Sequence, residues 1–146
     1  MFRIEKMNDE NVRGVAELEK ENFSDGWSLD SLKEEINNPN AFYLVAVDED
    51  TNEVAASGGL IISYDSADIM NVSVKEKYRR QSLAFKLLSE LIDEGRRIGI
   101  KEFTLEVREN NTPARALYEK LGFKFEGIRP NFYTKPVEGA AIYWLR

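Results

Sequence analysis

The chain has 146 residues, enough for a substantial hydrophobic core in one domain without disulfides or metals. It carries 20 basic and 26 acidic residues, a net charge of −6, which disfavours a general nucleic-acid-binding surface. Cysteine and histidine are both absent, which excludes disulfide scaffolds, thiol catalysis, Ser-His-Asp triads and nearly all zinc sites. We therefore expect no metal site, and any catalysis must use carboxylates, tyrosines, lysines or backbone groups.

The first residues, MFRIEKMNDENV, lack the apolar core of a signal peptide. No apolar run approaches the roughly 20 residues that a membrane span needs. We therefore expect a cytoplasmic protein that does not contact a membrane. The acidic composition suits a cationic acceptor, but it is equally typical of a protein kept soluble by its charge.

The N-terminal part of the chain predicts one short strand and two helices. Residues 2–7 are typical of an edge strand, and Asn8 or Asp9 would cap a helix that runs to about residue 22. Ser28 begins a second helix, because leucine and isoleucine follow it at helical spacing. The Asn-Asn-Pro run after this helix ends it.

The middle of the chain predicts a three-stranded meander and a long helix. Residues rich in β-formers at 41–47 and 53–64 flank an acidic connection, and a third run at 67–74 follows a short turn. A helix is then predicted over residues 82–98 from a leucine-rich stripe at helical spacing. Gly99 ends this helix.

The last third predicts strands at 103–107, 123–127 and 140–146, with a helix over 112–121 between the first two. The complete order is β-α-α-β-β-β-α-β-α-β-β. Because it combines a meander with a β-α-β-α-β unit, it indicates an α/β fold with a mixed sheet and helices on both faces. No linker or repeat divides the chain, so we expect a single domain over residues 1–146.

The segment from Val72 to Ala84 is the most informative about function. A strand leads into a basic loop that includes Arg79 and Arg80, and the loop opens directly onto the long helix. Unpaired N–H groups and the helix dipole make a helix N-terminus an anion site, and small residues there let a pyrophosphate approach the backbone. The alternative is an ordinary charged loop in which Ser82 is only the helix N-cap.

This segment resembles the cofactor motif of the GNAT superfamily of acetyl-coenzyme A-dependent acyltransferases. The family signature is Gln or Arg, two variable residues, Gly, one variable residue, then Gly or Ala; here the run is RRQSLA. The strand before it resembles the family's bulged cofactor strand. The resemblance implies that acetyl-CoA is bound by Val72, Ser73, Val74, Arg79, Arg80, Gln81, Ser82, Leu83 and Ala84.

A second GNAT hallmark follows at residues 110–123, NNTPARALYEKLGF, where an Asn precedes the pattern A-x-x-L-Y-x-x-x-G-F. In the family this Asn contacts the cofactor arm, whereas Asn111 could also simply cap the helix. The resemblance implies a GNAT-like fold, a mostly antiparallel sheet with a central β-α-β cofactor unit. It also implies an acetyl-CoA-dependent N-acetyltransferase.

Ser82 departs from the signature, since the family has glycine at this position. Glycine permits a positive φ and the closest approach to a phosphate. Serine can keep a helical N-terminal conformation and add a hydroxyl donor, or it can crowd the pyrophosphate. We expect the substitution to be tolerated.

Acetylation of an amine needs a base for the amine proton and an acid for the departing thiolate. Glu106 lies mid-strand, and partial desolvation there would favour a role as base; the alternative is a solvent-facing residue paired with Arg108 or Lys101. The phenol of Tyr118 could donate a proton to the thiolate; the alternative is a tyrosine packed in the core. Tyr118 can do both if its ring packs while its hydroxyl enters the cleft.

A finer resemblance is to the ribosomal-protein alanine N-acetyltransferase branch (RimI). The runs LEVR, LYEKLGF and IRPNFY match it, as does Trp27-Ser28, while the run KPVEGA departs from that branch's more acidic loop. The resemblance implies that Glu106 is the general base and Tyr118 the general acid. It further implies that Tyr118 contacts the cofactor and that Trp27 and Tyr133 border the acceptor groove.

Three functions remain in competition. The first is acetylation of a protein N-terminal α-amine, such as the N-terminal alanine of ribosomal protein S18, by direct attack in a ternary complex. The absence of cysteine excludes an acetyl-cysteine intermediate. The second is acetylation of a small-molecule amine or antibiotic, and the third is a non-catalytic acyl-CoA-binding regulatory domain. The oligomeric state stays open.

Overall fold

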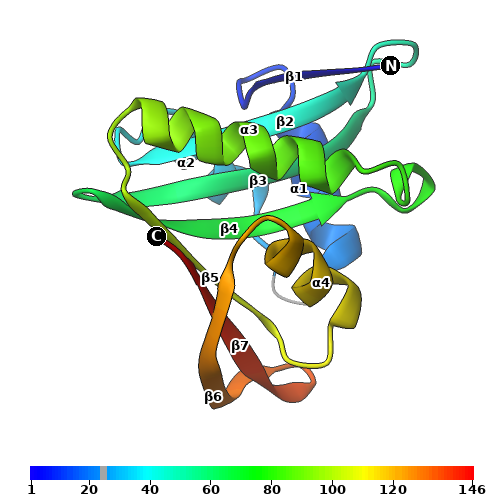
Figure 1. The fold of residues 1–146 in the computed structure, drawn as a ribbon. Helices are drawn as coiled ribbons and strands as arrows, with labels where there is room; N and C mark the ends of the chain where they lie inside the picture. Colours follow the sequence, from blue (N-terminus) through cyan, green and yellow to red (C-terminus); the bar gives the residue numbers. More distant parts are fainter. Residues whose placement is uncertain (24–25) are drawn as a thin grey trace.

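A computed structural model of the chain describes residues 1–23 and 26–146. Among the helices of these residues, none combines the length and the hydrophobicity that a membrane span requires. Figure 1 shows the arrangement of the elements. In chain order these are β1 (Phe2–Lys6), α1 (Val12–Asn22), α2 (Leu29–Ile36), β2 (Ala41–Asp48), β3 (Val54–Ser63), β4 (Ser66–Val74), the 3-10 turn η1 (Glu76–Tyr78), α3 (Leu83–Arg97), β5 (Glu102–Arg108), α4 (Thr112–Lys120), β6 (Lys124–Thr134) and β7 (Val137–Leu145).

The strands form one seven-stranded sheet in the order β1-β2-β3-β4-β5-β7-β6. Neighbouring strands are antiparallel except β4 and β5, which run parallel. Helix α3 supplies the crossover that a parallel pair requires. The predicted mixed sheet, mostly antiparallel around a central β-α-β unit, is confirmed.

Two hydrophobic cores lie on opposite faces of this sheet. Along β2, Leu44 and Ala46 join the core that α3 and α4 cover, whereas Val45 and Val47 join the core that α1 and α2 cover. Successive side chains of a strand point to opposite faces, so β2 is buried on both sides. The expected helices on both faces are confirmed, and Figure 1 shows α3 and α4 in front of the sheet.

The parallel pair separates along its length. In the described part of the chain, β4 pairs with β5 only where residues 66–68 face residues 102–104. Relative to β3, β4 also carries one extra residue between Met70 and Ser73, which is a β-bulge. The two strands therefore leave an opening in the middle of the sheet, beside the start of α3.

Helix α1 begins later than predicted. Its N-cap residue is Asn11, not Asn8 or Asp9, and the helix starts at Val12. The Asn8 side chain instead accepts hydrogen bonds from the backbone N–H groups of Glu10 and Asn11, at 2.9 and 3.0 Å. These bonds form a local turn before the helix.

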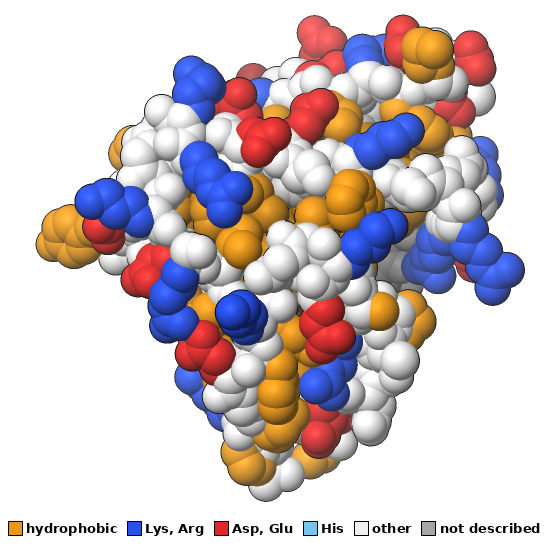
Figure 2. All heavy atoms as spheres, in the orientation of Figure 1, with side chains coloured by type: hydrophobic (Ala, Val, Ile, Leu, Met, Phe, Trp, Pro, Cys, Tyr) orange, Lys and Arg blue, Asp and Glu red, His pale blue; other side chains and the backbone are white. Residues whose placement is uncertain are grey.

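The last two strands are longer than predicted and form a hairpin that projects beyond the rest of the sheet. Strand β6 continues through Gly127 and Pro130 because it is an edge strand, where proline needs no ladder partner. The β6–β7 register shifts close to both residues, which accommodates them. On the face drawn in Figure 2, charges of both signs are interspersed and apolar side chains gather over this hairpin. Its exposed apolar residues are Phe125, Ile128, Phe132 and Val137.

Candidate active site

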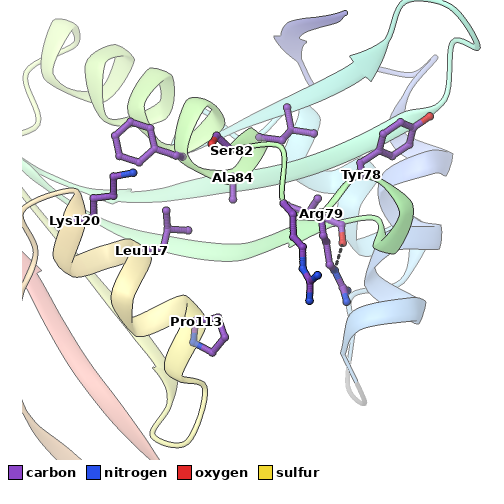
Figure 3. Close-up of a pocket in the computed structure, with 11 residues that line it drawn as sticks. Tyr78, Arg79, Ser82, Ala84, Pro113, Leu117 and Lys120 are labelled. Atoms are coloured by element: carbon purple, nitrogen blue, oxygen red, sulfur yellow. Dashed lines mark hydrogen bonds between the residues drawn. The ribbon is translucent and has the colours of Figure 1, made fainter.

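A pocket of about 320 Å³ lies between the loop before α3 and one face of α4 (Figure 3). The predicted motif supplies Arg79, Arg80 and the first turn of α3, and α4 supplies Leu117 and Lys120. Sequence reasoning missed Lys120, which faces the motif only because α4 packs beside α3. The two GNAT-like hallmarks therefore meet across one pocket.

The pocket has the features of an anion site. The first intrahelical bond of α3 runs from Lys86 N–H to the Ser82 carbonyl at 3.1 Å, so the N–H groups before it point out of the helix end. Arg80 and Ser82 have φ values of 66° and 58°, and such residues direct successive N–H groups into one concavity. With the cations of Arg79, Arg80 and Lys120 in the lining, these groups fit a pyrophosphate.

Ser82 does not have the helical conformation considered for it. Its φ of 58° and ψ of 20° are left-handed, and its side chain makes no capping hydrogen bond. The interpretation of Ser82 as an ordinary N-cap is wrong, because this backbone is the one that glycine adopts without steric cost. For serine it costs on the order of 1 kcal/mol.

Arg79 is held from two sides. Its Nε donates to the Val74 carbonyl at 3.2 Å, the dashed line in Figure 3, and its Nη2 donates to Asn22 Oδ1 at 2.6 Å. Asn22 also donates to the hydroxyl of Ser73. Ser73 is buried and lines neither cavity, so its contact is with α1. Helix α1 therefore contacts both segments that were predicted to bind the cofactor, the end of β4 through Ser73 and the loop before α3 through Arg79.

A larger cavity of about 570 Å³ opens where β4 and β5 separate. Its walls come from α1, β4, β5, α4 and β6. Five predicted site residues line it together: Val72, Glu106, Asn111, Tyr118 and Tyr133. Within the described residues no cluster of acidic side chains is placed to hold a metal ion.

Tyr118 is both packed in the core and part of the cavity wall, the two alternatives that the sequence left open. Its side chain is 8% exposed, and its ring packs against Phe123 and Tyr143 at centroid distances of 6.0 and 6.3 Å. It also lines the larger cavity. Burial, with a smaller contribution from Tyr133, raises the pKa of Tyr118 to about 12. The phenol therefore keeps its proton at neutral pH and can donate it.

Glu106 projects from β5 as the alternation predicted, with Leu105 and Val107 buried on the other face. Its side chain stays 36% exposed. Its ion-pair partner is Arg129 of β6, with 3.5 Å between Nη1 and Oε2, and not Arg108 or Lys101. The sequence could not indicate this pair because it joins two strands that are distant in the chain.

Arg108 instead fixes the position of Tyr133. It pairs with Glu138 at 3.1 Å, and its guanidinium lies 4.3 Å from the centre of the Tyr133 ring. Burial and the Glu106 carboxylate raise the pKa of Tyr133, while Arg108 opposes them. Tyr133 is thus a half-buried, protonated phenol in the wall of the larger cavity.

Two further predicted residues lie outside both cavities, and Asn111 has a structural role besides its place in the cavity wall. The Trp27 ring packs on Tyr43 at 6.2 Å and, like Gln81, lines neither cavity. Asn111 caps α4 by accepting a hydrogen bond from Ala114 N–H at 3.3 Å. It also lines the larger cavity, so the cap and a ligand contact are compatible.

Sequence reasoning missed a buried carboxyl in the same cavity. Glu19 of α1 is 2% exposed and lines the cavity. Its Oε1 has no hydrogen-bond partner among the described residues, while the backbone N–H of Trp27 bonds to the carboxyl group. A signal was present in the sequence, since Glu19 follows Val12 and Val15 at helical spacing on the apolar side of α1.

Residues 12–123 match the acetyltransferase (GNAT) family. A protein of Bacillus subtilis is 36% identical over 97% of this chain and 93% of its own length. The ribosomal protein bS18-alanine N-acetyltransferase of Haemophilus ducreyi is 32% identical over 91% of this chain and 90% of its own.

Solved structures of other acetyltransferases have the same fold as this chain. The crystal structure of the ribosomal-protein-S18-alanine N-acetyltransferase from Escherichia coli has a TM-score of 0.88 at 30% identity, covering 99% of this chain and 93% of that chain. Arabidopsis thaliana NAA60 in complex with acetyl-CoA has the same fold, with a TM-score of 0.87 at 17% identity over 99% of this chain and 98% of that chain. Acetyl-CoA is the acetyl donor of the GNAT family. From the family match and the extent of these similarities, the chain belongs to the GNAT family and is an N-acetyltransferase.

Proposed function

We propose that this protein uses acetyl-CoA to acetylate the α-amine of a protein N-terminus, and that its acceptor is the N-terminal alanine of ribosomal protein bS18. The observation that carries this proposal is the cavity between β4 and β5, where Glu106 and Tyr118 line one space. The relatives from Haemophilus ducreyi and Escherichia coli, both named as bS18-alanine N-acetyltransferases, support the acceptor. We propose that the chain acts in the cytoplasm. We also propose that residues 1–146 form one domain, since their strands join one sheet.

We assign acetyl-CoA to the smaller pocket and to the free edge of β4. The N–H groups at the start of α3, with Arg79 and Arg80, would hold the pyrophosphate. The bulged backbone at Val72 and the Asn111 and Tyr118 side chains face the larger cavity, where the acetyl end would lie. When bound, acetyl-CoA supplies an activated acetyl thioester.

The side chains of the larger cavity would divide the proton transfers between them. Glu106 would accept the proton that the acceptor nitrogen loses as the C–N bond forms. Tyr118 would donate its phenolic proton to the departing sulfur. Tyr133 would border the acceptor on the β6 side. Trp27, which precedes α2 and lines neither cavity, would border the acceptor only at the outer end of the groove. The amine would attack the thioester directly in a ternary complex, and the absence of cysteine excludes an acetyl-cysteine intermediate.

The test is an acetylation assay with acetyl-CoA and a panel of amines. We expect the highest kcat/KM for a peptide with the bS18 N-terminus, and no reaction with the same peptide blocked at its α-amine. Faster acetylation of polyamines or aminoglycosides would replace this acceptor with a small molecule. Binding of acetyl-CoA without acetylation of any amine would indicate a regulatory acyl-CoA-binding domain.

A further inference from the structure

Acetylation of an α-amine requires the loss of two protons. The ammonium form must lose one before its nitrogen can attack, and the nitrogen loses another as the amide forms. An α-amine has a pKa of about 7.7–8.0, so most of it is ammonium at neutral pH. Glu106 accounts for only one of these protons.

Glu19 is a second carboxyl group in the same cavity as Glu106 and Tyr118. It is 2% exposed, and its Oε1 has no hydrogen-bond partner in the described chain. Leaving a buried polar atom unpaired is destabilising, and apolar residues would fill this helix face without that cost. Because Glu19 lines the cavity, its unsatisfied carboxyl group points to a partner that comes from outside the protein.

The polar groups around Glu19 are already engaged with other residues. Asn22, on the same helix, bonds to Ser73 and Arg79. Arg108, across the cavity, donates to Glu138 and to the carbonyls of residues 135 and 136. A cationic ligand is the natural partner for a buried carboxylate that these groups leave uncompensated.

We propose that Glu19 binds the ammonium form of the acceptor's α-amine and takes the first of its two protons. The N–H bond breaks, its electron pair stays on nitrogen, and the proton moves to the Glu19 carboxylate, which leaves a neutral amine and a carboxylic acid. Glu106 then takes the second proton as the C–N bond forms. This assignment rests on the proposed function and adds a residue that contacts the acceptor.

The electrostatics of the cavity support this role. Burial raises the pKa of Glu19 to about 7, close to that of an α-amine, so the proton transfer is nearly balanced in free energy. Apart from Glu19 and Glu106, one more carboxyl lines the described cavity, that of the exposed Asp68. The remaining titratable groups in the lining are Arg108, Tyr118, Tyr133 and Lys135.

The experiment compares kcat/KM for the free-amine peptide across pH in wild type, Glu19→Gln and Glu17→Gln. Glu17 is an exposed residue of α1, so its variant has the same charge change without touching the cavity. At pH ~6.5 only about one in twenty α-amines is neutral, and there Glu19→Gln should lose about tenfold or more. At pH ~9, where most of the amine is already neutral, it should approach wild type. Glu17→Gln should follow wild type throughout.

A loss of equal size at every pH would assign Glu19 a packing role and overturn the proposal, as would a profile like that of wild type. A wild-type protein that acetylates no amine would refute the proposed function as well, so the two failures are distinguishable. Calorimetry adds a readout of the contact itself. Wild type should bind the peptide more tightly than its des-amino analogue, and Glu19→Gln should lose that preference while binding the analogue unchanged.

Discussion

Arg79 and Asn22 are joined by a hydrogen bond of 2.6 Å that links the loop before α3 to the end of α1. Asn22 also contacts Ser73 of β4. Because Arg79 lines the smaller pocket and α1 forms a wall of the larger cavity, these contacts connect the two cavities of the candidate site. A change at the end of α1 is therefore expected to reach the anion site.

Asn22→Ala tests this connection. Removing the amide leaves Arg79 without its partner on α1, and the loss of one charge-assisted bond of about 1 kcal/mol should weaken acetyl-CoA binding about fivefold. Calorimetric titration with acetyl-CoA measures the change. Asn40→Ala, at an exposed position outside both cavities, should bind as wild type. Equal affinities for Asn22→Ala and wild type would contradict the connection.

Ser82→Gly should preserve or tighten acetyl-CoA binding, because glycine adopts the φ of 58° without the steric cost of a side chain. We expect equal or higher thermal stability, since the strain removed offsets the added freedom of the unfolded chain. Ser89→Gly is the matched control, because a glycine inside α3 should cost about 0.5–1 kcal/mol. A clear loss of affinity in Ser82→Gly would show that the loop conformation is wrong.

Glu106→Gln should lower kcat by about 10²-fold and leave the Kd for acetyl-CoA unchanged. Glu102→Gln, in the same strand and outside the cavity, serves as the comparison. If kcat stays that of wild type, Glu106 is not the base.

Tyr118→Phe should reduce kcat and keep the fold, because the ring retains its packing on Phe123 and Tyr143. Only the hydroxyl is lost, and with it the proton for the departing sulfur. Tyr64→Phe removes a hydroxyl from a side chain that is 98% exposed and should change nothing. Thermal melting distinguishes the outcomes, since a Tyr118→Phe variant that unfolds would make the residue structural.

Glu19 should make the stability of the protein pH-dependent. Burial raises its pKa from 4.5 to about 7, so the folded state binds this proton more tightly than the unfolded chain. The resulting stabilisation is fully present below pH 4.5 and is lost as the pH rises through about 7. Between pH ~5 and ~8 we expect a loss on the order of 2–3 kcal/mol in wild type that Glu19→Gln does not show. Urea unfolding measures it, and parallel pH dependences in the two proteins would contradict the buried carboxyl.

Several features of this protein follow from short runs of sequence. Helices α1, α2 and α3 are indicated by apolar residues at helical spacing, a pattern that depends only on neighbours in the chain. The strand-loop-helix part of the candidate anion site is equally local, because the loop, Ser82 and the first turn of α3 are consecutive residues. Tyr118 was recognisable for the same reason, since it lies inside a contiguous family motif.

The remaining features depend on which elements pack together. The spacing of Glu19 along α1 is visible in the sequence, but its burial in a cavity wall follows from the separation of β4 and β5. The pairing of Glu106 with Arg129 requires β5 and β6 to lie on either side of β7. The left-handed backbone of Ser82 is imposed on a residue that does not favour it, because the strand and the helix on either side of the loop are held in one shared core. Local propensity determined the elements and the loop before α3 of this acetyltransferase, whereas long-range packing decided which of its carboxyl groups line the larger cavity.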